Sequence, residues 1–207
     1  PFLKANKLFS NRWKRLRNEQ LFREDLRDLT RIQEIGQVEV LAELIRHQAG
    51  QLLNYSTFAS KLNLPVSTIK RWMEVLYAFY YCFPVRPWRS NIPRALIKEP
   101  KIFLWDWSLV DDYGARVENM IGAHLLKAVH LWTDMGLGEY GLFFLRDKER
   151  REVDFLVTKN KKPWFLAEVK SHEDRSLSKH LNYFQQKINV PYTFQIAFDK
   201  DFVDRDC

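Results

Sequence analysis

The stretch Arg151-Glu-Val-Asp-Phe-Leu-Val157 and the stretch Pro163-Trp-Phe-Leu-Ala-Glu-Val-Lys170 decide the fold that the sequence predicts. Apolar and polar side chains alternate along both, which is the period-two pattern of β-strands. Residues 160–162, Asn-Lys-Lys, are polar and form the predicted turn between them. We therefore expect an antiparallel hairpin at this point of the chain.

Alternation assigns each residue of the hairpin to a face. On the first strand it groups Glu152, Asp154 and Leu156 against Val153, Phe155 and Val157, and on the second Trp164, Leu166, Glu168 and Lys170 against Phe165, Ala167 and Val169. Pairing the strands would bring Asp154, Glu168 and Lys170 together. Carboxylate oxygens hold a hard cation such as Mg²⁺, and a lysine supports an attacking water or a developing phosphate charge. The alternative is a set of charged residues on the solvated face of a ribbon.

Composition limits the class of protein. The chain has 207 residues, a hydrophobic content of 46% and a formal net charge of +7. These values favour an ordered globular protein with a polyanionic partner such as nucleic acid. No apolar run reaches the roughly 20 residues that span a bilayer, so we expect no membrane contact. The two cysteines, Cys82 and Cys207, provide no disulfide framework, which favours a cytoplasmic location.

The first half of the chain is predicted to be helical. Residues 1–36 form a basic segment of one or two amphipathic helices. Residues 37–49 form the next helix, ending at Gly50 as a C-cap. A short helix follows from Asn54 to Leu62, and another begins at Ser67 as its N-cap.

Two strands, residues 80–88 and 101–106, follow these helices and complete a winged helix-turn-helix pattern over residues 37–110. Its recognition helix and wing would offer basic side chains to nucleic acid: Lys70, Arg71, Arg89 and Arg94. Winged helices serve protein partners equally well, so both kinds of partner remain open.

Residues 111–207 form the predicted C-terminal domain. A long helix over 113–133 precedes a strand at 140–146, the hairpin, a helix over 176–188 and a strand from 192, in the order α-β-β-β-α-β. Glu118 heads an otherwise apolar row of the long helix. Because burying an unpaired charge is costly, a metal or Lys170 would relieve it. The alternatives are water, Arg116 or a neighbouring arginine.

The arrangement D-(x)n-E-x-K, in this order of elements, resembles the PD-(D/E)xK nuclease superfamily. The predicted fold class is therefore α+β or α/β, with a helical and winged-helix part before a restriction-endonuclease-like domain. The resemblance implies that Glu118, Asp154 and Glu168 ligate Mg²⁺ or Mn²⁺. It implies a catalytic role for Lys170 together with Asp154 and Glu168. The candidate auxiliary residues are Glu152 and Gln185, with Gln186 as the alternative to Gln185 on the later helix.

Further motifs extend over nearly the whole chain: Arg23-Glu-Asp-Leu-Arg-Asp28, Leu53-Asn-Tyr-Ser56, Thr68-Ile-Lys-Arg-Trp72, Glu99-Pro-Lys101, Trp105-Asp106, Gly114-Ala-Arg-Val-Glu-Asn119, Arg151-Glu-Val-Asp-Phe155 and Glu168-Val-Lys170. Together they resemble the C-terminal half of a prokaryotic AAA+-type ATP-binding protein family that carries a conserved domain of unknown function. This implies a partner ATPase domain and makes residues 1–36 a lid-like remnant of it. The chain has no G-x-x-x-x-G-K-[ST], so we expect no ATP site in it.

Three functional hypotheses follow. The first is a magnesium-dependent endodeoxyribonuclease or resolvase-like module that acts on DNA, branched DNA included. The second is a catalytically silent nuclease-like domain that serves binding or assembly in a larger ATPase. The third is a winged-helix regulator, which leaves the alternating carboxylates unexplained. The residues leave the oligomeric state open.

Overall fold

The chain forms two compact units. The computed structural model describes residues 7–25, 34–88, 99–170 and 178–197. Unit 1 comprises residues 1–48 and 54–83, and unit 2 comprises residues 49–53 and 84–207.

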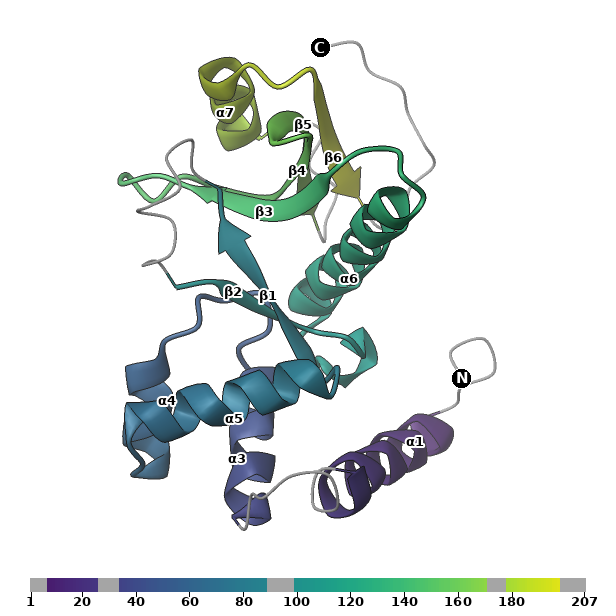
Figure 1. The fold of residues 1–207 in the computed structure, drawn as a ribbon, viewed down its shortest axis with the longest axis vertical. Helices are drawn as coiled ribbons and strands as arrows, with labels where there is room; N and C mark the ends of the chain where they lie inside the picture. The colour runs from purple at the N-terminus through teal and green to yellow at the C-terminus, as the bar shows by residue number, and fades with distance from the viewer. Residues whose placement is uncertain (1–6, 26–33, 89–98, 171–177, 198–207) are drawn as a thin grey trace. The chain divides into compact units, whose positions relative to one another are not determined.

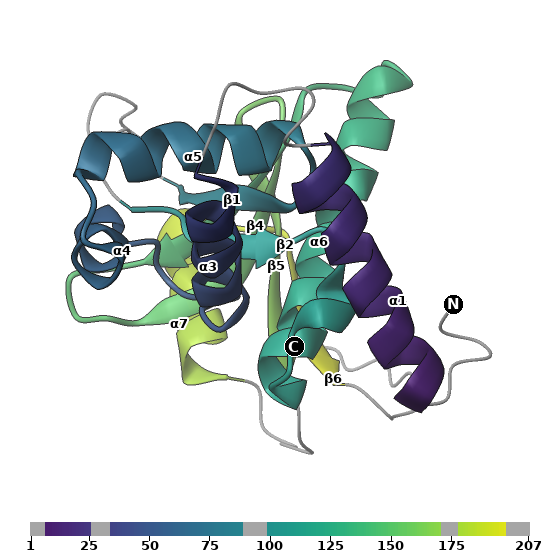
Figure 2. The ribbon, with the colours of Figure 1, turned by 90° about the horizontal axis from the view of Figure 1, so that it is seen from below.

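Unit 1 is helical. Its elements are α1 (Lys7–Glu19), the π-helical turn η2 (Gln20–Asp25), α3 (Ile35–Arg46), α4 (Tyr55–Leu62) and α5 (Val66–Ala78). The described part thus confirms the predicted helices. Each of α3, α4 and α5 buries one apolar face, with Leu41, Phe58 and Trp72 almost fully enclosed. Burial of these faces stabilises the helices, which are too short to persist alone in water. Figure 2 shows α5 running crosswise to α3.

The α4–turn–α5 segment has the helix, tight turn, helix form that the sequence predicts. Asn54 caps α4, because its side-chain oxygen accepts a hydrogen bond from the Thr57 N–H at 3.0 Å. Asn63 ends α4 in the left-handed conformation, with φ +53°. The predicted N-cap of α5 was wrong: the cap is Pro65, and Ser67 lies inside the helix. Proline suits this position because it has no N–H to leave unsatisfied.

The predicted end of the third helix was also wrong. α3 stops at Arg46 with His47 as its C-cap, and Gly50 belongs to the connection that follows. Gly50 adopts φ +78°, a left-handed conformation that favours glycine. Its N–H donates to the carbonyl oxygen of Ile102 at 2.7 Å, and Leu52 bridges Lys101. Gly50 therefore fixes a segment of unit 2 beside the strand that begins at Lys101.

Unit 2 is built on a six-stranded mixed sheet. Its elements are β1 (Cys82–Pro87, which begins at the end of unit 1), β2 (Lys101–Leu104), the 3-10 turn η4 (Trp107–Leu109), α6 (Tyr113–Asp134), β3 (Tyr140–Arg146), β4 (Glu152–Lys159), β5 (Lys162–Lys170), α7 (Lys179–Ile188) and β6 (Tyr192–Ala197). The strand order is β2-β1-β3-β4-β5-β6. β3, β4 and β5 are antiparallel neighbours, whereas β1–β3 and β5–β6 are parallel pairs. The predicted hairpin and the α-β-β-β-α-β order are confirmed.

Two helices cover opposite faces of the sheet in unit 2 (Figure 1). On one face, Leu181 and Phe184 of α7 pack in a cluster with Val153 and Leu156 of β4. On the other face, α6 approaches closely at Gly122, where an added Cβ would lie 3.0 Å from the Phe155 ring. The sheet is thus enclosed by apolar side chains on both faces, which accounts for the nearly continuous burial of β4.

A β-bulge in β4 breaks the predicted alternation. Phe143 pairs with Leu156 and Leu145 pairs with Val153, so Asp154 and Phe155 together oppose the single residue Phe144. Val153 and Leu156 consequently join the same cluster, although alternation assigns them to opposite faces. The predicted grouping of Leu156 with Asp154 was wrong. A bulge changes the direction in which a strand residue's side chain points. The bulge in β4 includes the candidate metal ligand Asp154.

The coarse fold prediction, a mixed α+β chain, is confirmed. β1 and β2, which were predicted to belong to a winged helix, extend the same sheet as the hairpin. The predicted wing, with Arg89 and Arg94, lies outside the described residues. None of the described helices has both the length and the apolar character needed to cross a membrane.

Candidate functional site

The position of Glu118 is set by its neighbour Asn119 on α6. The Asn119 side chain is fully buried and binds the backbone of Leu104 in β2 twice. Its amide donates to the Leu104 carbonyl oxygen at 2.6 Å, and its oxygen accepts from the Leu104 N–H at 2.8 Å. This clamp satisfies both backbone groups and locks α6 to β2. Glu118 is thereby held against the start of β2.

Lys101, the first residue of β2, is the centre of the site. Its side chain is only 4% exposed, and its ammonium contacts three carboxylates. Lys101 Nζ lies 2.7 Å from Glu152 Oε1, 3.0 Å from Glu118 Oε1 and 3.6 Å from Asp154 Oδ1. Glu152 also binds Arg146 at 3.0 Å. A buried charge is tolerated when it is paired and hydrogen-bonded in this way.

One ammonium shared among three carboxylates compensates each of them only in part. Burial lowers the pKa of Lys101, but Glu118, Asp154 and Glu152 outweigh burial and raise that pKa above its ordinary value. Burial raises the pKa of Glu118 to about 7, Asp154 adds to this, and Lys101 opposes it. Burial likewise raises the pKa of Asp154 against the opposing effects of Lys101 and the Val169 N–H. Lys101 therefore gains from its partners, while Glu118 and Asp154 stay under-compensated.

The hairpin supplies the second half of the site. Asp154 Oδ2 accepts a hydrogen bond from the Val169 N–H at 2.9 Å, which joins β4 to β5 next to Glu168. Glu168 Oε1 lies 2.6 Å from Lys170 Nζ. Glu168 is 93% buried, because its relative exposure is 7%, and its Oε2 has no hydrogen-bond partner in the described part of the chain. A buried carboxylate oxygen without a partner is rare and points to a missing cation or water.

The structure brings the predicted metal and catalytic residues into one network. Glu118, Asp154 and the predicted auxiliary residue Glu152 meet at Lys101. The Asp154 bond to the Val169 N–H places the Glu168–Lys170 pair beside them. Gln185 lies half-buried on α7, and the described contacts do not join it to the network. In unit 1, Lys70 and Arg71 are exposed on α5.

The cation beside Glu118 is Lys101, and neither Lys170 nor Arg116 pairs with it as predicted. Arg116 instead donates to the backbone carbonyl oxygens of Val110 and Asp111. Lys170 pairs with Glu168, and Glu118 pairs with Lys101. The sequence signal was a lysine that opens a four-residue buried strand, Lys101-Ile-Phe-Leu104. A buried strand with a charge at its first residue indicates an acidic partner elsewhere in the fold.

The donor chemistry of the network fits a divalent metal ion, because carboxylate oxygens are the ligands that Mg²⁺ prefers and Glu168 Oε2 is available. Lys101, however, occupies Glu118 Oε1 and Asp154 Oδ1. In this arrangement no group of three or more Asp, Glu, His or Cys side chains among the described residues is placed to hold a metal ion.

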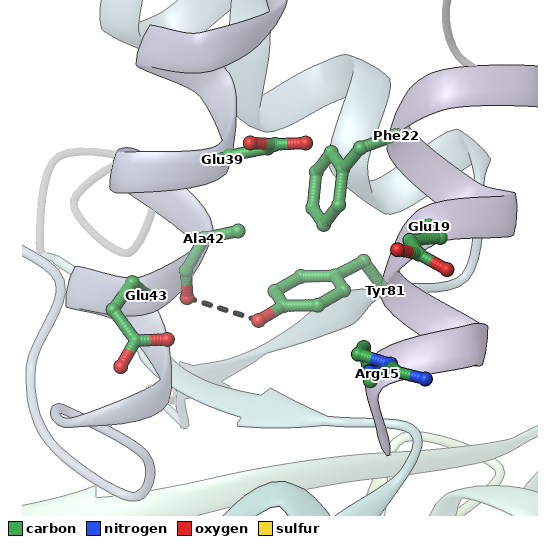
Figure 3. A pocket seen from close by; sticks show the side chains of 7 residues that line it. All are labelled: Arg15, Glu19, Phe22, Glu39, Ala42, Glu43 and Tyr81. Atoms are coloured by element: carbon green, nitrogen blue, oxygen red, sulfur yellow. Dashed lines mark hydrogen bonds between the residues drawn. The ribbon is translucent and has the colours of Figure 1, made fainter. Parts of the chain in front are cut away.

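Unit 1 contains a cavity that no sequence pattern predicts. It measures about 390 Å³ and is lined by Arg15, Glu19, Phe22, Glu39, Ala42, Glu43 and Tyr81. Figure 3 shows the Tyr81 hydroxyl donating to the Ala42 carbonyl oxygen, a contact of 3.0 Å. Phe22 stacks edge-on against the Tyr81 ring at 5.8 Å. The lining thus combines two aromatic side chains with three glutamates and one arginine.

These features define an α+β chain with a partly buried acidic cluster beside its mixed sheet. The chain belongs to the DUF8612 family, a domain of unknown function, whose model matches residues 4–115. Residues 113–203 match the model of a second domain of unknown function, DUF4143, which is found in AAA-like ATPase family proteins. The boundary between the two matches falls at the start of α6. No curated protein and no solved structure matches the chain.

Proposed function

We propose that the chain is the DNA-binding, nuclease-like part of a larger ATP-binding protein, and that its acidic cluster hydrolyses phosphodiester bonds. The observation that carries the proposal is the convergence of Glu118, Asp154, Glu168 and Lys170, from α6, β4 and β5, in one partly buried cluster. The occurrence of DUF4143 in AAA-like ATPase family proteins supports the link to an ATPase domain.

Each residue has a definite task in this reaction. Glu118, Asp154 and Glu168 would hold Mg²⁺, which supplies Lewis-acid polarisation of the phosphate and a more acidic bound water. Lys170 is the most exposed of the set, with 34% of its side chain accessible. Its ammonium can therefore reach a phosphate oxygen and stabilise charge that develops there. The Val169 N–H fixes the orientation of Asp154.

Unit 1 would contribute DNA affinity. Lys70 and Arg71 are exposed on α5, the second helix of the α4–turn–α5 segment. Exposed basic residues on a helix of this kind suit contacts with phosphates or base edges in the major groove. The net charge of +7 agrees with a polyanionic partner.

A cleavage assay tests the proposal. Supercoiled, linear and branched DNA is incubated with the chain in Mg²⁺ or Mn²⁺, next to Asp154→Asn and Lys170→Met. Lys162→Met is the matched control, because Lys162 is an exposed lysine of the same hairpin. We expect cleavage by the wild type and the control and its loss, by at least a hundredfold, in the two site variants. Cleavage that survives in Asp154→Asn would refute the assignment.

A second candidate is favoured by Lys101. The cluster already has an internal cation, so it can serve as a structural ion network that joins α6, β2 and β4. In that case the nuclease-like domain is catalytically silent and acts in binding or assembly. This candidate predicts DNA binding without divalent dependence and no cleavage by any variant. A winged-helix regulator would instead depend on Lys70 and Arg71 and be indifferent to Asp154.

A further inference from the structure

The acidic network of unit 2 carries a near balance of charge without any added ion. In the described part of the chain, its charged members are Glu118, Glu152, Asp154 and Glu168 against Lys101, Arg146 and Lys170. Four carboxylates against three cations leave a formal charge of −1. Removing the charge of Lys101 would leave −2, which a single divalent cation neutralises.

The oxygen atoms that a divalent cation needs are held by Lys101. The Lys101 ammonium contacts one carboxylate oxygen of Glu118 and one of Asp154. The other oxygen of Asp154 accepts a hydrogen bond from the Val169 N–H. The other oxygen of Glu118 faces Gly50, where an added Cβ would lie 3.2 Å away. Glu168 Oε2 is the buried oxygen left open. A divalent cation cannot bind Asp154 and Glu118 at short range while the Lys101 ammonium stays beside them, because like charges repel strongly in a poorly solvated site.

We propose that Lys101 is a built-in counter-ion that competes with a divalent cation of the Mg²⁺ class for Glu118 and Asp154. The inference rests on the proposed function only in treating the cluster as a divalent-cation site. Cation binding then requires the Lys101 side chain to leave its carboxylates. In the absence of the ion, Lys101 holds the carboxylates of the cluster together, so they are already in place when a cation binds.

The test is a titration with Mn²⁺ alone, followed by electron paramagnetic resonance, with no DNA present. It compares the wild type, Lys101→Met, Lys162→Met and the double variant Lys101→Met/Asp154→Asn. Methionine keeps the length of the lysine stem and removes its charge. Lys162→Met makes the same change of net charge at an exposed position of β5. We expect Lys101→Met to bind Mn²⁺ at least tenfold more tightly than the wild type and the control, and the double variant to lose the gain.

Stability measurements cover the case in which Lys101→Met does not fold. Without Lys101, Glu118 and Asp154 lose their cation, whereas Glu152 keeps Arg146. The two uncompensated carboxylates destabilise the fold, and Mn²⁺ should restore it, so an Mn²⁺-dependent melting temperature in Lys101→Met supports the inference. Equal Mn²⁺ affinity in the wild type and Lys101→Met overturns it. So does failure of both Lys101→Met and Lys101→Gln to fold with or without Mn²⁺. If Lys101→Met gains Mn²⁺ affinity but the wild type cleaves no DNA, the proposed nuclease activity is refuted and the counter-ion role of Lys101 is supported.

Discussion

Lys101 Nζ lies 3.0 Å from Glu118 Oε1, an ion pair between the first residue of β2 and the first turns of α6. The lysine side chain is 4% exposed and the glutamate side chain 21% exposed. Interactions between such groups are little screened by solvent. The pair also explains why an acidic residue heads the apolar row of α6: its counter-charge comes from a strand that precedes the helix in the chain.

Stability should fall as the pH rises from 5 to 8. Burial, together with Asp154, raises the pKa of Glu118 to about 7 from its ordinary 4.5. A carboxyl group whose pKa is raised by folding holds its proton more tightly in the folded state, so its contribution is fully present below pH 4.5 and is lost as the pH passes 7. The loss amounts to at most about 3 kcal/mol. Urea unfolding at several pH values, with divalent ions chelated, measures it.

Glu118→Gln is the control for this pH dependence. The amide cannot ionise but can still accept a hydrogen bond from Lys101, so the fall in stability between pH 5 and 8 should shrink markedly. Asp154 adds a fall of the same sign, because its pKa is also raised by burial. A full, unchanged slope in Glu118→Gln would show that Glu118 is not the titrating group.

Replacing Asn119 by alanine should lower the free energy of unfolding by about 2–4 kcal/mol, because the Leu104 N–H and carbonyl lose their partners inside the protein. Asn182→Ala is the matched change at an exposed position of α7 and should cost less than about 1 kcal/mol. Urea unfolding of both variants measures the two losses. Equal losses of unfolding free energy in Asn119→Ala and Asn182→Ala would argue against the Asn119 clamp.

Gly122→Ala and Gly36→Ala should have opposite effects. A Cβ at Gly122 would lie 3.0 Å from Phe155 Cζ, so overpacking should destabilise by about 1–3 kcal/mol. A Cβ at Gly36 in α3 meets nothing within 4 Å, so alanine should stabilise by about 0.5–1 kcal/mol. Combining Gly122→Ala with Phe155→Leu should recover part of the loss. Thermal unfolding of the wild type, Gly36→Ala, Gly122→Ala, Phe155→Leu and the double variant tests both predictions. Additive losses in the double variant would contradict the predicted contact.

Lys70→Met and Arg71→Met should each weaken DNA binding and flatten its dependence on salt. A residue that neutralises one phosphate contributes about one unit to the slope of log affinity against log salt concentration. Lys162→Met should leave the slope unchanged. Fluorescence anisotropy at several salt concentrations gives the slopes. Slopes that match the wild type in both α5 variants would remove these residues from the interface.

Much of the fold follows from local pattern. The period-two runs predict β4 and β5 because a strand places alternate side chains on opposite faces. The i+3/i+4 row predicts α6 almost to the residue, and Asn54 marks the start of α4. The departures have local causes as well. Two β4 residues oppose Phe144, which shifts the alternation, and Pro65 starts α5 before Ser67 can cap it.

The sequence alone determined which carboxylates and which lysine of the hairpin could meet, because residues joined by a short turn have their pairing set by the turn and the pleat. The tertiary structure alone decided the partner of Glu118 and the charge state of the cluster. Lys101 reaches Glu118, Glu152 and Asp154 from β2, an edge strand whose place depends on the long-range Asn119 clamp. Burial then decides how strongly those charges interact, because the interaction energy of two charges depends on how much solvent surrounds them. The pattern of neighbouring residues in the sequence does not specify that solvent exposure.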